Sequence, residues 1–577
     1  MRHEKIAPQL MVALENYQEE GRVGLIRHMR SLGVIPSVGS PKPARAVVFI
    51  HCEEQARLDN LAQYGIRVNQ SRGKIRTALL PIESIGPLSD DPAVERIISS
   101  HYLRLRMDVA PGKVHIPEFR RNSRLSGKGV MIGIVDTGID PNHPAFLGRI
   151  LRIWDQTLDG PGVAEGGYGL ELTGAQLTAS RDREGHGTHV AGIATGFDPV
   201  FGGIAPGADL VIVKSDLQDA HIADGIRYIF RVAQDLGRAA VVNLSLGGHY
   251  DAHDGSDSLS QIIDMESGEG RIVCCAAGNE GNDNIHAQGV IPAGAVRTIR
   301  FRVPTGMVHM AALNGWYPGV NSLEVSIRTP GKFVTPFQGV ISSGSYVKTY
   351  TLPDARIRIA TPGPDPANGD HNFFIEMGAP PGLPVRGGIW QLRVRNISAT
   401  DARLDIWTLD DQISPEVVFT GASVKDSMKI GSPGAAASAI TVASYTTKVQ
   451  WTDIDGHVRT VGLVLDDISD FSSEGPLRNG KQKPDVTAPG AMIVSCLSAD
   501  SQPSRAEMVN PNFLAMAGTS MATPFIAGIV ALLLERDPKL GPQDVKTLLR
   551  AHSAIPGQPA GTFDPKWGFG LIDALGL

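Results

Sequence analysis

The sequence predicts an α/β protein with a parallel sheet flanked by helices, a small N-terminal α+β unit and an inserted all-β sandwich. Two kinds of apolar pattern indicate this fold class. Several short runs are apolar throughout, as strands buried on both faces of a parallel sheet are. Elsewhere apolar residues alternate with polar ones, which is typical of antiparallel strands with one exposed face. A length of 577 residues allows several domains, so the two patterns can belong to separate units.

Strand-like and helix-like stretches are mixed near the N-terminus. Residues 46–50 and 77–80 have the composition of strands, whereas residues 55–64 and 92–99 resemble helices. We therefore expect residues 1–105 to form a small α+β unit.

A basic segment, residues 101–121, contains two prolines and predicts an exposed linker. The buried-strand pattern begins after it. Apolar residues at a helical spacing over 222–233 separate two of these strands, so strand, helix and strand alternate as in a doubly wound sheet. We expect function at the carboxyl ends of such strands. The strands are predicted at residues 130–135, 210–213, 241–244 and 272–277.

Residues 284–425 differ from the sequence on either side. Their alternating pattern predicts an inserted sandwich whose two ends lie close together. A buried strand at 439–443 and a helix at 521–534, apolar almost all round, then complete the α/β domain. That domain accordingly consists of residues 106–283 and 426–577. Strands of the insert are predicted at residues 299–303, 323–327 and 390–394.

Composition argues against several classes of partner. A formal charge of −6 and the lack of a basic block give little attraction for nucleic acid or an anionic membrane, so neither is expected to bind. Four cysteines are too few for a disulfide framework, and Cys274 and Cys275 lie in an apolar run, so buried thiols are expected. The N-terminal residues do not follow the signal-peptide pattern and no eighteen-residue apolar window occurs, so we expect a cytoplasmic protein.

Three polar side chains stand in glycine-rich segments of the predicted α/β domain. Asp136 ends a buried strand, His186 lies between two glycines, and Ser520 begins the predicted buried helix, at the positive end of its dipole. Each alone has an ordinary structural explanation, such as a turn aspartate or an N-cap serine. His186 and His189 could also form a metal pair, but no glutamate lies between them and no third ligand is evident.

Together the three segments resemble the signature motifs of the subtilases. Aspartate, histidine and serine follow one another in the order of that family's catalytic triad. The similarity extends over residues 125–283 and 426–577. The matching segments are Val135-Asp136-Thr137-Gly138, Gly185-His186-Gly187-Thr188-His189-Val190-Ala191-Gly192 and Gly518-Thr519-Ser520-Met521-Ala522-Thr523-Pro524.

The resemblance implies a subtilisin-like fold and a serine endopeptidase that acts on proteins or peptides through an acyl-enzyme. Ser520 would attack the peptide carbonyl, His186 would take up and return the proton, and Asp136 would orient the imidazole and stabilise its cation. Asn279 matches the oxyanion-hole asparagine of the family.

The same resemblance places the substrate beside two short segments. Ser245, Leu246 and Gly247 match the extended segment that pairs with the substrate backbone as an added strand. Nothing in the sequence assigns a charge to the floor of the primary specificity pocket. The other wall of that pocket would consist of Ala276, Ala277 and Gly278.

The sequence departs from the family pattern at two places. Many subtilases have a calcium-binding aspartate shortly after the catalytic one, where this chain has Ala145, so a calcium site is in doubt and no metal or cofactor is expected. The second departure is the insertion at 284–425. Its position resembles the jelly-roll insertion of the clostridial spore-germination subtilases.

Residues 1–105 resemble a subtilase prodomain, which implies autoprocessing between Leu103 and Asp108 and a partner role for the released prodomain. Two alternatives stay open. The chain could be a catalytically silent scaffold that binds without hydrolysing, or the insert could bind carbohydrate. The aromatic residues available for carbohydrate are Trp316, Tyr317, Trp390 and Trp407, which core packing explains equally well.

Overall fold

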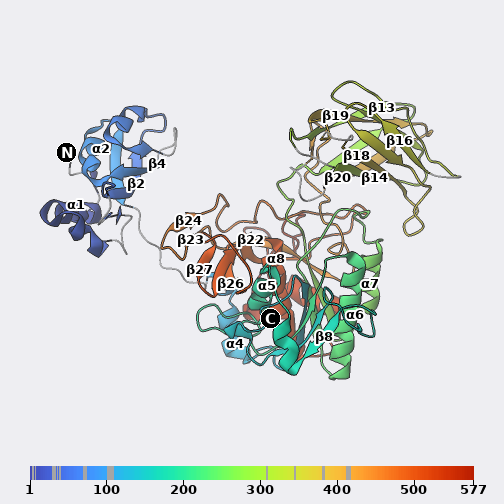
Figure 1. Cartoon of the computed structure of the whole chain (residues 1–577), viewed down its shortest axis with the longest axis horizontal. Helices are drawn as coiled ribbons and strands as arrows, with labels where there is room; N and C mark the ends of the chain where they lie inside the picture. The colour runs from blue at the N-terminus through green and yellow to red at the C-terminus, as the bar shows by residue number, and fades with distance from the viewer. Residues whose placement is uncertain are drawn as a thin grey trace. The chain divides into compact units, whose positions relative to one another are not determined.

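The computed structural model divides the chain into two compact units, Met1–Leu105 and Arg106–Leu577 (Figure 1). The segment predicted to be cleaved, Leu103 to Asp108, lies outside the described residues. The structure describes residues 1–2, 5–6, 8–28, 34–35, 37, 41–68, 75–99, 109–306, 310–342, 346–379, 384–410 and 417–577.

The first unit is built on an antiparallel sheet. Within its described residues β2 lies between β4 and β5, β1 also pairs with β2, and β3 pairs with β4. Leu10 and Leu14 of the first helix pack in one core with Val48 and Ile50 of the sheet. The elements are α1 (Pro8–Glu20), η2 (Gly21–His28), β1 (Val34–Ile35), β2 (Arg45–Cys52), η3 (Asp59–Tyr64), β3 (Arg67–Val68), β4 (Ile75–Pro81), η4 (Ile82–Ser84), α2 (Ile85–Asp90) and β5 (Val94–Ser99).

One secondary-structure prediction in this unit is wrong. Residues 94–99, expected to be helical, form β5 and pair with β2. The register shifts at His51/Cys52, so Val94 and Ile97 are both buried although they are three residues apart. This bulge imitates the spacing of a helix, which is why the apolar pattern was misleading.

The second unit contains, in its described residues, a ten-stranded sheet. Neighbouring strands are parallel except at the two edges, where β7 pairs with β8 and β29 with β30. Its order is β29-β30-β25-β22-β11-β10-β6-β9-β7-β8. The strands are β6 (Met131–Asp136), β7 (Ile150–Asp155), β8 (Leu170–Thr173), β9 (Asp209–Lys214), β10 (Ala240–Leu244), β11 (Arg271–Ala276), β22 (Ile440–Thr446), β25 (Val486–Ala491), β29 (Ser553–Ala554) and β30 (Leu571–Ile572).

Helices cover both faces of this sheet because successive strand residues point to opposite sides. Ile132 and Ile134 of β6 pack in one core with α5 and α8, whereas Met131 and Val135 pack in another with α6 and α7. The predicted α/β fold with a mostly parallel sheet is therefore confirmed. The helices are α5 (His186–Thr195), α6 (Asp219–Asp235), α7 (Ser258–Glu266), α8 (Thr519–Arg536) and α9 (Pro542–Ala551). Two short 3-10 helices of this part are η5 (Pro144–Phe146) and η6 (Gly174–Ala179).

Helix α8 is the centre of this packing. Among the described residues it is the one helix whose length and composition would also suit a membrane span, yet 89% of its eighteen-residue window is buried inside the fold. It contacts β10, β11, β22 and β25 as well as α5. A helix that is apolar on every side and enclosed in this way is a core helix.

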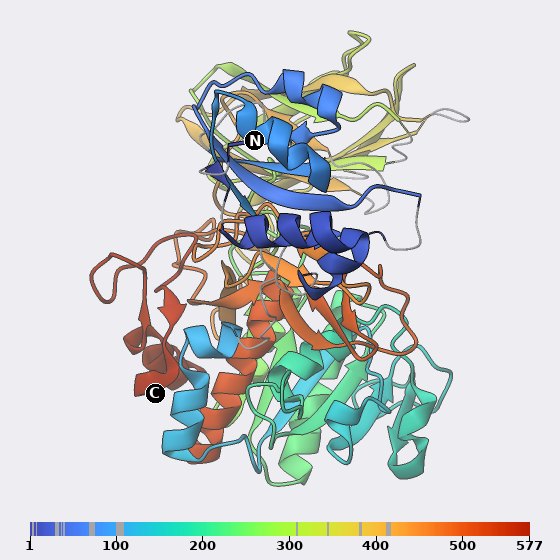
Figure 2. The same ribbon diagram turned by 90° about the vertical axis from the view of Figure 1, so that its left-hand side faces the viewer.

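The prediction of an exposed linker at residues 101–121 is wrong for its described part, residues 109–121. These residues form two short helices, α3 (Val109–Lys113) and α4 (Ile116–Ser123). Figure 2 shows α4 beside the C-terminal end of the chain, where it contacts η7 (Ala574–Gly576). Ile116 and Phe119 are buried in the core that contains α8, because the arginines of α4 can extend into solvent while its apolar residues face inward.

Residues 284–425 contain two antiparallel sheets around a core of their own. In the described part, six strands form one sheet in the order β12-β20-β14-β18-β17-β16, and four form the other in the order β15-β19-β13-β21. Trp390 and Tyr317 lie in or against this core, and Trp316 and Trp407 are also buried, so none of these rings offers an exposed surface for carbohydrate. The strands are β12 (His286–Ile291), β13 (Val296–Val303), β14 (Met310–Tyr317), β15 (Leu323–Arg328), β16 (Val347–Thr351), β17 (Arg356–Ala360), β18 (His371–Gly378), β19 (Gly388–Asn396), β20 (Ala402–Asp410) and β21 (Val418–Thr420).

Two small antiparallel sheets complete the second unit in its described residues. Their strands are β23 (Gln450–Thr452), β24 (Val458–Thr460), β26 (Ile493–Cys496), β27 (Met508–Asn510) and β28 (Phe513–Met516).

The packing of α4 can be tested by substitution. Phe119→Ala should destabilise the second unit by about 3–5 kcal/mol, because it leaves a cavity in the core around α8. Arg121→Ala on the same helix is the control, since that side chain is 72% exposed and its pair with Glu118 is worth little. The measurement is the midpoint of urea unfolding of the full chain. Equal midpoints for the two variants would mean that α4 is not part of the core.

Candidate active site

The structure joins two of the three predicted catalytic residues directly. Asp136 is the last residue of β6 and His186 the first residue of α5, and Asp136 Oδ1 lies 2.8 Å from His186 Nδ1. The same oxygen accepts the backbone N–H of Thr137 at 2.7 Å. Burial acts to lower the pKa of His186, but the surrounding carboxylates, Asp136 first among them, outweigh it and raise that pKa above its ordinary value. The pair therefore stabilises an imidazolium.

A second aspartate, Asp182, holds the turns that carry this pair. It is fully buried and accepts hydrogen bonds from Thr137 Oγ1 at 2.9 Å and from the backbone N–H of Gly185 at 2.8 Å. It also accepts the N–H of Thr188 at 2.9 Å. Sequence reasoning missed Asp182, because it lies in a charged run, residues 181–184, that has the composition of an exposed loop.

Gly187 allows the two turns to approach each other. A Cβ atom at this position would lie 2.2 Å from the carbonyl oxygen of Gly138, in the turn that follows Asp136. Any larger side chain would push the two turns apart and separate His186 from Asp136. The close approach of the turns therefore requires glycine at position 187.

Ser520 occupies the second position of α8, where the first amide groups of the helix have no partner within it. Its Oγ donates a hydrogen bond to the carbonyl of Ser245 at 3.1 Å, and Ser245 Oγ donates to the Ser520 carbonyl at 2.8 Å. In the described chain the Ser520 hydroxyl thus bonds to the strand exit after β10 and not to His186.

Asn279 is fixed at the same helix end. Its Oδ1 accepts the backbone N–H of Thr519 at 2.9 Å and the Thr519 hydroxyl at 3.0 Å. Because the amide oxygen is used in this way, the Nδ2 hydrogens are the part of the side chain left for another acceptor.

A pocket of about 180 Å³ lies beside Ser520. It brings together all of the predicted substrate-binding residues, Asn279 and Ser520, whereas Asp136 and His186 are not among its lining residues. Its walls follow β10 and β11, whose carboxyl ends are adjacent because the two strands are parallel neighbours. The lining residues are Ser245, Leu246, Gly247, Gly248, His249, Ala276, Ala277, Gly278, Asn279, Glu280, Lys429, Gly431, Ser432, Thr519 and Ser520.

Three charged or titratable residues of this pocket were missed by sequence reasoning: His249, Glu280 and Lys429. Burial acts to raise the pKa of Glu280, but His249, the Ser473 hydroxyl and the Asn279 N–H together lower it to about 2. The pocket wall therefore carries a carboxylate. Glu280 directly follows Asn279 and His249 lies two residues after Gly247, so both could have been found. Lys429 follows the insertion, and no motif marks it.

Comparison with known proteins identifies the family. The model of the subtilase family matches residues 127–375 and 394–570, which is more than half of the chain. The chain belongs to the subtilase family. The resemblance inferred from the three motifs is thereby confirmed, and with it the class of enzyme, a subtilisin-like serine protease.

Two subtilases show how far this sequence differs from known members of the family. Serine protease AprX of Bacillus subtilis is 24% identical over 481 residues, which is 80% of this chain and 70% of AprX. Thermitase of Thermoactinomyces vulgaris is 35% identical over 165 residues, which is 27% of this chain and 50% of thermitase. The solved CspB protease of Clostridium perfringens shares the fold, with a TM-score of 0.66, 24% identity and coverage of 81% of this chain and 97% of its own.

The residues present do not fit the calcium site that many subtilases have after the catalytic aspartate. Ala145 supplies no carboxylate, and its carbonyl accepts a hydrogen bond from the guanidinium of Arg149. Arg149 also donates to the carbonyls of Thr195 at 2.6 Å and Ala208 at 3.3 Å. A fixed side-chain cation thus occupies these carbonyl oxygens, which are of the type that calcium prefers as ligands.

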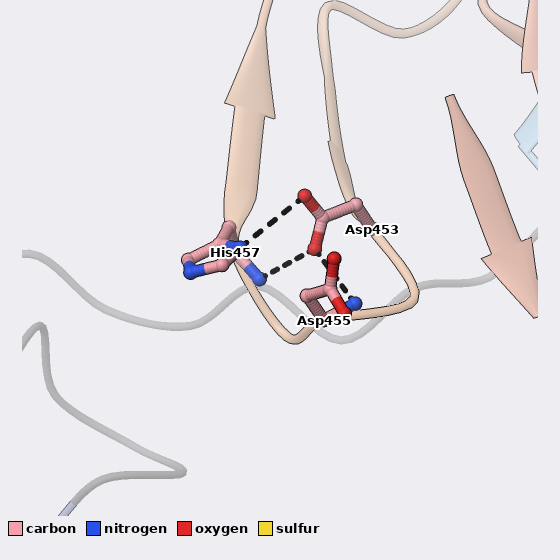
Figure 3. Close-up of side chains that lie close together, drawn as sticks. All are labelled: Asp453, Asp455 and His457. Atoms are coloured by element: carbon pink, nitrogen blue, oxygen red, sulfur yellow. Dashed lines mark hydrogen bonds and ion pairs between the residues drawn. The ribbon is translucent and has the colours of Figure 1, made fainter. Parts of the chain in front are cut away.

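Another acidic group, Asp453, Asp455 and His457, lies in the hairpin between β23 and β24 (Figure 3). Asp453 Oδ1 accepts the backbone N–H groups of Asp455 and His457 at 3.0 and 2.8 Å. Its other oxygen accepts from Arg459 at 2.7 Å, and Asp455 pairs with Arg505 at 3.0 Å. These bonds explain why the three side chains lie together: they belong to a hydrogen-bonded turn in which two arginines balance the charge of the aspartates.

If Arg149 takes the place of a bound calcium ion, a chelator should not change the thermal stability of the protein. A chelator should leave the thermal midpoint of the wild-type protein unchanged, whereas Arg149→Met should lower the free energy of unfolding by about 2–3 kcal/mol, because three carbonyls lose a charged donor. The free energy of unfolding of Arg149→Lys should lie between those of the wild type and Arg149→Met, since an ammonium group cannot reach all three oxygens at once. Calorimetry with and without chelator measures both effects. A chelator-dependent midpoint in the wild type would show that a bound cation stabilises this fold after all.

Proposed function

We propose that the chain is a serine endopeptidase in which Asp136, His186 and Ser520 form the catalytic triad. The observation that carries this proposal is the 2.8 Å contact between His186 Nδ1 and buried Asp136. Ser520 stands at the N-terminus of α8, the position that the family motif gives to the nucleophile. His186 would accept the Ser520 proton at Nε2 as Oγ bonds to the substrate carbonyl carbon. It would then give that proton to the leaving amine as the C–N bond breaks, and water would hydrolyse the acyl-enzyme.

The oxyanion of the tetrahedral intermediate would be stabilised by two hydrogen-bond donors. Asn279 Nδ2 and the backbone N–H of Ser520 are donors near the same helix end, and the positive end of the α8 dipole adds to both. The hydrogen bonds that Thr519 makes to Asn279 Oδ1 support this assignment, because they fix the amide before the substrate arrives.

Substrate would bind as an added strand along Ser245–Gly247, with one side chain in the pocket beside Ala276–Gly278. The position of this pocket next to Ser520 supports that role. A protein or peptide substrate is consistent with the protease relatives that the chain matches.

We further propose that residues 1–105 are a prodomain removed by the enzyme itself, and that residues 284–425 are a jelly-roll insertion. A separate compact unit at Met1–Leu105 supports the first assignment, since a removable segment must fold independently of the rest. Two antiparallel sheets around a separate core support the second.

A catalytically silent scaffold is the alternative function. It is favoured by the hydrogen bond from Ser520 Oγ to the Ser245 carbonyl, which competes with the bond to His186. Labelling with a fluorophosphonate distinguishes the two functions, because only a serine activated by the imidazole reacts rapidly.

Substitution of the triad gives the first test of the mechanism. Ser520→Ala and His186→Ala should each abolish peptide hydrolysis while the circular dichroism spectrum stays the same. Asn279→Ala should lower kcat about 10²–10³-fold with a smaller change in KM, as expected for the loss of one oxyanion donor. Steady-state kinetics on a chromogenic peptide measures these effects. Peptide hydrolysis by Ser520→Ala at the wild-type rate would rule out this triad.

Autoprocessing gives the second test. Wild-type protein should separate into two fragments with a junction between Leu103 and Asp108, whereas Ser520→Ala should keep its full mass of 61.5 kDa. Intact mass spectrometry of both proteins, purified side by side, locates the junction. An uncut wild-type chain that still hydrolyses peptides would contradict the prodomain assignment without affecting the triad.

A further inference from the structure

Part of the outer face of the six-stranded sheet, at neighbouring positions of β12, β20 and β14, is buried, although an outer face of a β-sandwich normally meets solvent. His286, Asn314 and Trp407 lie side by side on it, because Trp407 pairs with His286 on β12 and with Asn314 on β14. Their exposed fractions are 0%, 3% and 0%. None of the three belongs to the sandwich core, so another part of the unit covers them.

The covering segment is the loop from His249 to His253. The Asn314 side-chain amide donates to the carbonyl of His249 at 3.1 Å and to the carbonyl of Asp251 at 3.0 Å. Its Oδ1 accepts hydrogen bonds from Trp316 and Asn372, also in the six-stranded sheet. The amide is therefore held in one orientation with both donor hydrogens on the loop.

Aromatic rings make the second contact between sheet and loop. The rings of His253 and Trp407 are stacked with centroids 3.8 Å apart, and the His286 ring also stacks on Trp407 at 4.7 Å. His249 Nδ1 lies 2.9 Å from His253 Nε2, so one of these two nitrogens donates to the other. The indole N–H of Trp407 donates to the Met428 carbonyl at 2.9 Å.

These contacts lead to the substrate pocket. His249 lines the pocket, and its Nε2 lies 3.5 Å from Glu280 Oε2. That oxygen accepts the backbone N–H of Asn279 at 2.8 Å and the hydroxyl of Ser473 at 2.8 Å. A displacement of the loop would therefore move one pocket wall and the carboxylate that holds Asn279.

We propose that Asn314 and Trp407 are positioning residues for substrate binding: they hold the His249–His253 loop, and through it the Glu280 wall of the pocket, in the geometry that accepts a peptide side chain. This inference rests on the proposed function of Ser520 and its pocket. The insertion thus determines substrate selection through one face of its sheet, without contributing a residue to the pocket itself.

Two substitutions test this role. Trp407→Leu removes the ring stack, and Asn314→Asp removes both amide donors at nearly constant shape. Each should lower kcat/KM for peptide anilides about 10–100-fold, mainly through KM, because a small misplacement of a binding wall has effects of this size. Hydrolysis of p-nitrophenyl acetate should change less than about threefold, because this ester does not fill the pocket and Thr519 still holds the Asn279 side-chain amide for the oxyanion.

Trp390→Leu is the matched control. Trp390 is a fully buried tryptophan of the same sandwich, but it lies in the core between the sheets, so its loss weakens the sandwich without touching the loop. This variant should keep the wild-type ratio of peptide to ester hydrolysis. Hydrogen exchange read by mass spectrometry should show faster exchange of the loop, residues 249–253, in Trp407→Leu and Asn314→Asp than in the control.

The outcomes separate this proposal from the function on which it rests. An unchanged peptide-to-ester ratio, or an equal change in the Trp390→Leu control, would overturn the positioning role, as would exchange of the loop that matches the wild type. If Trp407→Leu does not fold, Asn314→Asp carries the test alone. A wild-type protein that hydrolyses neither substrate and takes no fluorophosphonate label would reject the proposed function, and the exchange data would still decide whether the sheet holds the loop.

Discussion

The burial of α8 is the constraint on which the rest of the α/β unit depends. An eighteen-residue helix enclosed on every side must be matched by apolar surface from the sheet and from α5, and each Leu, Ile or Phe buried in this way contributes about 1.5–3 kcal/mol. Gly528 allows the close approach, because a Cβ there would lie 2.5 Å from the side chain of Ile204. The helix has one position in such a core, and its N-terminus therefore fixes Ser520 and Thr519 beside the ends of β10 and β11.

The charged groups of the site follow from the same packing. Asp136 is tolerated at the buried end of β6 because His186 and a backbone N–H use one of its oxygens. Asp182 is fully buried and satisfied by hydroxyl and backbone donors from both turns. Loss of either carboxylate would leave donors without acceptors, so the turn geometry and the electrostatics of the site support each other.

The sandwich shows how an insertion can be part of an enzyme without entering its active site. Its core is complete, but its outer face carries polar and aromatic residues that only the α/β part buries. Arg478 joins the two parts further, with a charge shared between Asp254 at 3.0 Å and Asp370 at 2.7 Å. Hydrogen bonds and stacked rings at such an interface are directional, so they fix orientation as well as contact.

The sequence by itself determined the family, the parallel sheet and the three motifs, because periodicity and local glycine-rich turns are properties of neighbouring residues. It placed Asp136 at the end of a strand and Ser520 at the start of a helix, where the structure has them. It failed where the deciding contact is remote in the chain: the bulge in β5, which depends on pairing with β2, and the burial of α4 against the core that contains α8. Only the tertiary structure decided that Asp182, Glu280 and His249 belong to the site and that one sheet face of the insertion holds the pocket loop. Such contacts join residues far apart in the chain, and no local pattern records which of them will meet.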